Sequence, residues 1–155
     1  MAFEWITIGS HPNIWKLDRP YRKAVSGLLY HKEECVLGLR GQKVAQSGKW
    51  ELVPSGHLEG EPYVDILREL KEETGIEYEE LKSIYPIGFV LDHREQIYEY
   101  AYALELKKKK EISLQKNLEY EEFRWVKMEE LSLWEEDLLK LSTEIYRVFS
   151  ANRLR

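Results

Sequence analysis

Three glutamates, Glu69, Glu72 and Glu73, are spaced so that a helix over residues 62–74 would place them on one side, opposite its apolar residues. Like charges at these spacings repel one another, and the last turn of a helix disfavours anions. Carboxylate oxygens that converge from one face are suitable ligands for Mg²⁺. An acidic, solvated helix face is the alternative. Because this repulsion would destabilise a helix face that was merely solvated, the spacing favours a divalent-metal site.

Other side chains could serve the same chemistry from outside this helix. Arg40 ends a strand-like segment and could contact a phosphate, although such an arginine is as often a surface residue. Trp50 could stack on a base, although most aromatic residues in a chain of this kind belong to the core. Cys35, the one cysteine, lies in an apolar segment that is typical of a buried strand, so we interpret it as inert rather than nucleophilic.

The elements that must position these residues follow from hydrophobic patterning. Pro62 suits the first turn of the helix and Gly75 its end. Strands are expected at 23–30, 35–40, 84–91, 96–106 and 122–126, with a short extended piece at 50–54 and a last helix at about 134–150. Interleaved strands and two helices predict an α/β domain over residues 1–155, with a mixed sheet covered by helices and an N-terminal extension at 1–20.

Composition narrows the classes of function. The chain has 155 residues and a net charge of −5, which argues against broad nucleic-acid binding. The basic run at 107–110 is interpreted as a solvated loop. No apolar run is long enough to span a membrane, no secretory signal precedes the domain, and a single cysteine forms no intrachain disulfide. These features predict a cytoplasmic protein.

The segment 68–76, Arg-Glu-Leu-Lys-Glu-Glu-Thr-Gly-Ile, resembles the second half of the Nudix box at every fixed position. The flanking segments 37–40, 50–59 and 119–131 are also similar to this family, so the likeness covers roughly residues 22–150. The resemblance implies a Nudix-type α/β/α sandwich. It also implies a pyrophosphohydrolase that splits a nucleoside diphosphate linked to another moiety: a nucleotide, a nucleotide sugar or a dinucleoside polyphosphate.

In one loop the chain departs from the family pattern. It has four residues between Gly56 and Glu61 and six between Glu61 and Arg68, each one fewer than in the family. Glu61 is therefore a doubtful site residue. The shortening leaves open a second reading, a Nudix-fold nucleotide-binding module with weak or no turnover. Isomerase chemistry of the isoprenoid type is less favoured, because Cys35 is the only thiol available for it.

The resemblance also implies roles for individual residues. Glu69 and Glu73 are the first choice of metal ligands, Glu72 is the next, and the backbone carbonyl of Gly56 completes the shell. The expected metal is Mg²⁺, with Mn²⁺ as an alternative. Arg68 is expected to hold the glutamates by bidentate pairing.

The general base is left open among Glu69, Glu73 and Glu119, with Glu119 preferred.

Arg40 and Trp50 are the expected substrate contacts. The expected partner is a nucleoside diphosphate derivative, with a homodimer left open. The sequence does not select one nucleotide.

Overall fold

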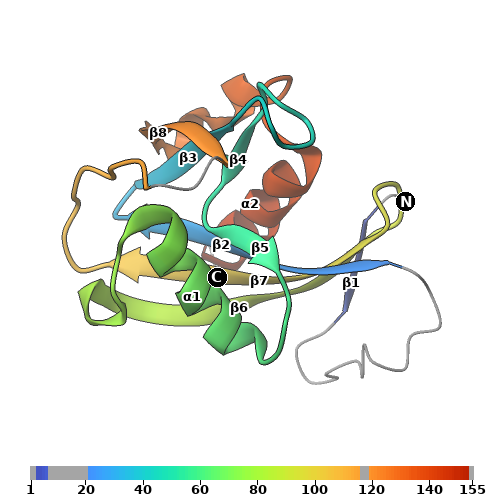
Figure 1. Ribbon diagram of the computed structural model, residues 1–155, viewed down its shortest axis with the longest axis horizontal. Coiled ribbons are helices and arrows are strands. Elements are labelled where there is room, and N and C mark those ends of the chain that lie inside the picture. Colours follow the sequence, from blue (N-terminus) through green and yellow to red (C-terminus); the bar gives the residue numbers. More distant parts are fainter. Residues whose placement is uncertain (1–2, 7–20, 116–118, 154–155) are drawn as a thin grey trace.

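A mixed β-sheet of eight strands forms the centre of the protein in the part of the chain that the computed structural model describes, residues 3–6, 21–115 and 119–153 (Figure 1). In chain order the elements are β1 (Phe3–Ile6), β2 (Arg22–His31), β3 (Glu34–Arg40), β4 (Trp50–Leu52), β5 (Ser55–His57), α1 (Pro62–Thr74), the 3-10 helix η2 (Tyr78–Glu80), β6 (Leu81–Asp92), β7 (Ile97–Leu106), β8 (Tyr120–Lys127), the 3-10 helix η3 (Met128–Trp134) and α2 (Lys140–Arg153).

The strands lie in the order β1-β6-β7-β2-β3-β4, with β5 paired to β2 and β8 paired to β3. The central pair, β2 and β7, is parallel, whereas the other pairs are antiparallel. A parallel pair needs a long connection, and here α1 lies within it. The sheet is therefore mixed, as the sequence predicted.

One helix covers each face of the sheet (Figure 1). Ile66 and Leu70 of α1 belong to a buried apolar cluster on one side. Ile145 and Phe149 of α2 belong to a second cluster on the other side. This arrangement confirms the α/β/α sandwich.

The limits of α1 match the prediction because the signals at both ends are local. Pro62 occupies the first turn, where its missing N–H is no loss. Gly75 ends the helix in the left-handed conformation at φ 75°, and its N–H donates to the Lys71 carbonyl at 2.9 Å.

The prediction for the last helix was wrong at its start. Trp134 ends η3, and α2 begins only at Lys140. Between them Leu138 is buried in the core, and the Trp50 carbonyl accepts a hydrogen bond from the Leu139 N–H. After Trp134 the chain makes a single turn, in which the Leu138 N–H donates to the Trp134 carbonyl at 2.8 Å, and then runs beside β4 before α2 begins.

Part of the expected N-terminal extension belongs to the sheet. β1 pairs with the edge of β6, and the Trp5 indole N–H donates to Glu144 of α2 at 2.9 Å. Residues 7–20 lie outside the described part of the chain. Both β1 and β5 were missed in the sequence because each has only a few residues.

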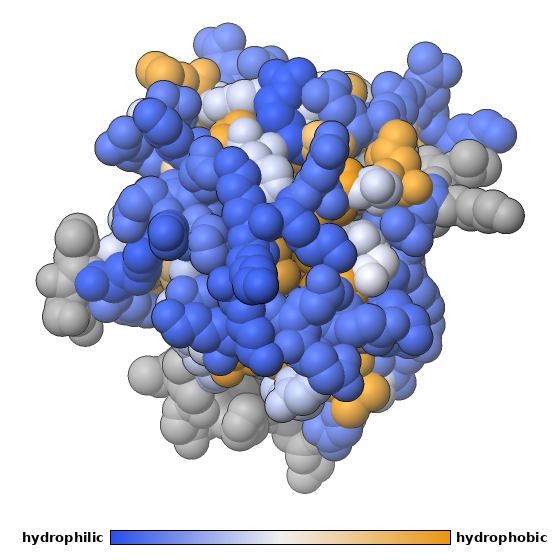
Figure 2. Space-filling model, turned by 90° about the vertical axis from the view of Figure 1, so that its left-hand side faces the viewer, coloured by the Kyte–Doolittle hydropathy of each residue, from blue (hydrophilic) through white to orange (hydrophobic). Residues whose placement is uncertain are grey.

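The surface seen in Figure 2 is mostly hydrophilic. In the basic run, Lys109 pairs with Glu34 at 2.6 Å and Lys110 with Glu80 at 3.0 Å, which agrees with a solvated loop. Cys35 is buried in β3, and burial, with a smaller effect of the Glu34 charge, raises its thiol pKa to about 12, which agrees with an inert residue. Among the described residues no helix is both long and apolar enough to cross a membrane.

Candidate active site

Helix α1 directs two of its three clustered glutamates into the protein. Glu69 is 8% exposed and Glu73 is 1% exposed, although both are charged residue types. Glu72, on the same helix, has an exposed side chain. The three carboxylates expected to act together are therefore divided into a buried pair and one solvent-facing neighbour.

Strand β5 closes over the buried pair. A Cβ placed on Gly56 would lie 2.2 Å from the carboxyl carbon of Glu69, so only glycine leaves room for that carboxyl group. The neighbouring Ser55 N–H donates to Glu73 Oε2 at 3.0 Å. The shortened loop therefore still brings Gly56 to the glutamates of α1.

The loop is held by Asp65 in the first turn of α1. Its Oδ2 accepts hydrogen bonds from the backbone N–H groups of Glu59 at 2.7 Å and Gly60 at 2.9 Å. Glu61, the residue placed in doubt by the shortening, is the exposed N-cap of α1 and lies outside the cavities described below.

Among the described residues, Arg68 is the cation that the structure pairs with the two buried carboxylates, and it contacts Glu69. Burial raises the pKa of Glu69 to about 7, with Arg68 acting in the opposite direction and Glu72 adding to the rise. Burial also raises the pKa of Glu73 well above its usual range; the Ser55 N–H opposes this, and the charges of Glu69, Glu51 and Glu119 reinforce it. This electrostatic environment would favour a cation.

Arg68 is the cation nearest to this face of the helix. Its Nη1 donates to Glu69 at 2.9 Å and to Glu72 at 3.4 Å. Its Nη2 lies 3.5 Å from both the His57 carbonyl and Asp65 Oδ1. Arg68 thus links two of the glutamates and the short loop, but through one nitrogen on each carboxylate rather than the bidentate pairing expected.

Another buried carboxylate, Glu51 of β4, was not predicted as a site residue. Its Oε2 is 3.0 Å from Arg40 Nη1, and its Oε1 accepts hydrogen bonds from the hydroxyls of Ser55, at 3.0 Å, and Tyr120. Burial, together with the Glu51 charge, raises the Tyr120 pKa well above its usual range, so this phenol is a donor at neutral pH. The network fixes Arg40 beside β5.

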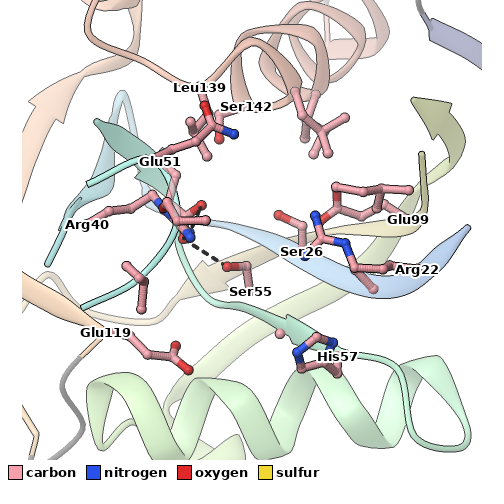
Figure 3. A pocket seen from close by; sticks show the side chains of 18 residues that line it. Arg22, Ser26, Arg40, Glu51, Ser55, His57, Glu99, Glu119, Leu139 and Ser142 are labelled. Carbon is pink, nitrogen blue, oxygen red and sulfur yellow. Dashed lines mark hydrogen bonds and ion pairs between the residues drawn. The ribbon is translucent and has the colours of Figure 1, made fainter. Parts of the chain in front are cut away.

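A cavity of about 270 Å³ opens above this network, between β2, β5, β7 and the start of α2 (Figure 3). Its wall is apolar on the α2 side and charged on the sheet side. The lining includes Arg22, Ser26, Arg40, Glu51, Ser55, Gly56, His57, Ile97, Glu99, Glu119, Leu139, Leu141, Ser142 and Ile145.

Glu119 connects the two parts of the site. It lines both this cavity and a second, open one bordered by Glu69, Glu72 and Glu73. Its backbone carbonyl accepts a hydrogen bond from the Gly41 N–H at 2.8 Å, which anchors it beside Arg40.

Trp50 is the expected site residue that the structure places elsewhere. It is buried in the core, with its ring 5.3 Å from that of Trp134 and under the guanidinium of Arg124. It does not line the cavity that contains Arg40. The sequence could not distinguish these places, because an aromatic residue at a strand start suits either one.

The donor set fits a divalent cation in its chemistry. Glu69, Glu73 and Glu119 influence one another electrostatically, and the backbone of Gly56 lies against Glu69. Within the described ranges, no group of three or more His, Cys, Asp or Glu side chains is already arranged as a metal site. The ligands are thus near one another without forming a complete shell.

Comparison with known proteins agrees with this geometry. The model of the NUDIX domain matches residues 20–149 of the sequence. The chain belongs to the Nudix family. Family membership confirms the expected fold and the expectation of a Nudix-type pyrophosphohydrolase. A search of curated proteins finds no match.

Solved Nudix structures share the fold at low sequence identity. The MutT protein from Methanosarcina mazei Go1 is 24% identical with a TM-score of 0.68, covering 90% of this chain and 99% of its own. The NUDIX domain of Shewanella oneidensis NrtR, solved with ADP ribose, is 16% identical with a TM-score of 0.70 and coverages of 97% and 100%. A C. elegans Ap4A hydrolase is 20% identical with a TM-score of 0.64 and coverages of 86% and 98%.

Proposed function

We propose that this Nudix protein hydrolyses the diphosphate bond of a nucleoside diphosphate linked to another group, and that it requires Mg²⁺ or Mn²⁺. The close contact between Gly56 and the Glu69 carboxyl group is the observation that carries the proposal. It shows that β5 still lies against the glutamates of α1 although the loop between them is short. The Ap4A and ADP-ribose named for two structural relatives are nucleoside diphosphate derivatives of this class.

Glu69 and Glu73 would hold the cation, with the Gly56 carbonyl beside them and Glu72 available from the solvent side. A bound divalent cation supplies charge neutralisation for the diphosphate and lowers the pKa of water. The raised pKa values of both buried glutamates support this assignment, since each carboxylate would be stabilised by added positive charge.

Other residues of the chain would orient the substrate and move protons. Arg40 is fixed by Glu51 at the cavity wall, where its guanidinium could receive a phosphate oxygen. Glu119 lies between the two cavities and could accept a proton from the attacking water. The cavity beside Arg40 would take the nucleoside half of the substrate, as its volume lies near the lower end of the range for small-ligand sites.

A substrate panel tests the proposal. ADP-ribose, a dinucleoside tetraphosphate, a nucleoside triphosphate and a nucleotide sugar would each be incubated with Mg²⁺ or Mn²⁺, and the released nucleoside monophosphate and phosphate measured. We expect turnover of at least one substrate, which Glu69→Gln reduces and Glu79→Gln, an exposed change nearby, does not. Nucleotide binding without turnover on the whole panel would favour the binding module instead.

A further inference from the structure

Glu99 in the middle of β7 is a buried acid that the proposed chemistry does not use. It is 5% exposed and lines the cavity beside α2. Its Oε2 has no hydrogen-bond partner among the described residues. Buried polar atoms are almost always paired, so an unpaired one on a residue that lines a cavity requires an explanation.

The surroundings of Glu99 show what kind of group would pair with it. Ser26 and Arg22 of the parallel neighbour β2 lie next to its carboxyl group, on the side of the cavity away from Arg40, Glu51 and Glu119 (Figure 3).

Apolar side chains form another part of the cavity wall. They come from Ile97 and from the start of α2, at Leu139, Leu141 and Ile145. An apolar wall with a few polar groups gathered at one end suits a flat heterocycle better than a sugar, which carries hydroxyls all round.

We propose that Glu99 selects the nucleobase of the substrate, and that its carboxyl group forms a hydrogen bond with the edge of the base. This inference rests on the proposed function, since it places the base at the end of the cavity away from Glu69 and Glu73. Arg40 and Glu119 would then lie on the side of the phosphates.

The electrostatic environment of Glu99 determines the protonation state in which its carboxyl group would contact the base. Burial and the charges of Glu51 and Asp92 raise its pKa to about 8, against the opposing effects of Ser26 and Arg22. At pH 7 the carboxyl group is therefore mostly protonated. A neutral carboxylic acid can donate from its hydroxyl oxygen, so the expected contact is an acceptor on the base, such as a ring nitrogen.

Two substitutions separate this role from a structural one. Glu99→Gln keeps a donor and the shape, whereas Glu99→Met keeps the approximate length and removes both polar atoms. Glu99→Met removes the unpaired Oε2 but also takes a hydrogen-bond partner from the buried Ser26 hydroxyl, so the fold of this variant is checked by thermal melting. Ser26→Ala is a second way to disturb the carboxyl group. Glu105→Met is the matched control, on the same strand but paired with Ser83 and Lys82 outside the cavity.

The measurement is calorimetric binding of AMP, GMP, CMP, UMP and ribose 5-phosphate, with Mg²⁺ at pH 7. We expect wild type to prefer one base by about 10-fold or more. Glu99→Met should lose about 10- to 100-fold for that base, with ribose 5-phosphate unchanged, and Glu99→Gln should keep most of the preference. Loss in both variants would still assign base selection to Glu99, acting as its anion.

An unchanged order of bases in Glu99→Met, or no preference in wild type, overturns the inference. So does a failure of all four nucleotides to bind. If the substrate panel shows metal-dependent turnover, these outcomes reject base selection by Glu99 and leave the proposed hydrolysis intact. If base selection is observed but no substrate is turned over, the hydrolase proposal alone is rejected.

Discussion

Gly56 in β5 and Glu69 in α1 touch so closely that a methyl group on Gly56 would overlap the Glu69 carboxyl group, 2.2 Å from its carbon. The atoms in the way are the end of a flexible side chain rather than backbone. A larger residue at position 56 would therefore move the carboxylate and leave the fold largely intact.

Gly56→Ala should reduce kcat/KM by about 10²-fold, as expected when a catalytic group is displaced. The melting temperature should change little. Gly60→Ala is the control, because nothing lies within 4 Å of a Cβ placed there. Equal rates for both variants would show that the position of the Glu69 carboxylate does not matter for turnover.

Glu73→Gln keeps the shape of the side chain and an acceptor for the Ser55 N–H, but removes a buried charge. We expect the rate to fall by at least about 10²-fold. Melting of the metal-free protein should stay the same or rise, because repulsion from Glu69, Glu51 and Glu119 is relieved. A variant with normal turnover would mean that Glu73 has no part in the reaction.

Removal of divalent metal should abolish turnover. Among the described residues, Arg68 is the only cation paired with these glutamates, and one positive charge does not balance both Glu69 and Glu73. Adding Mg²⁺ to the metal-free protein should raise its melting temperature by linkage. The measurement is a thermal melt and an activity assay in EDTA, then in excess Mg²⁺. Full turnover in excess EDTA contradicts the metal assignment.

The short loop depends on Asp65, whose carboxylate accepts two backbone N–H groups. Asp65→Ala should lower the free energy of unfolding by about 1–2 kcal/mol, as for loss of a helix cap. It should also reduce activity, because this loop follows β5 directly and helps to hold Gly56 in place.

Inserting two residues between Gly60 and Pro62 should bring a modest gain in rate at most. A gain above about 10³-fold would show that the natural loop impairs the enzyme.

Glu99 should make stability depend on pH in a defined direction. Its pKa is about 8 in the folded protein against an ordinary 4.5, so between these values the folded state binds more protons than the unfolded state. The contribution of Glu99 to the free energy of unfolding is fully present below about pH 4.5 and is lost as the pH rises through 8. Relative to Glu99→Gln, wild type should thus melt progressively lower from pH 5.5 to 9. A constant difference would mean that Glu99 is ionised throughout.

Prediction from sequence succeeded where the signals were local. Pro62 and Gly75 set both ends of α1. Of the three glutamates expected on one face, Glu69 and Glu73 turn inward toward β5, whereas Glu72 faces solvent. The start of α2 was missed, because packing of Leu138 and Leu139 against Trp50 decides it. That packing joins segments far apart in the sequence.

The cavity could not be predicted for the same reason. Glu51 and Glu99 each interrupt an apolar strand pattern, which was the available signal for both. Their meaning comes only from partners on other elements, such as Arg40 and Tyr120 for Glu51 and Ser26 for Glu99.

The parallel pairing of β2 with β7 also governs when the cavity can exist during synthesis. Arg22 and Ser26 emerge early, but Glu99 follows only after the whole connection through α1, and the α2 wall up to Ile145 comes almost last. Contacts between such distant segments form late, because the intervening chain must first be closed into a loop. A nascent or truncated chain would therefore fold its hairpins before it could recognise any nucleotide, and ligand recognition would report that the entire domain has been assembled.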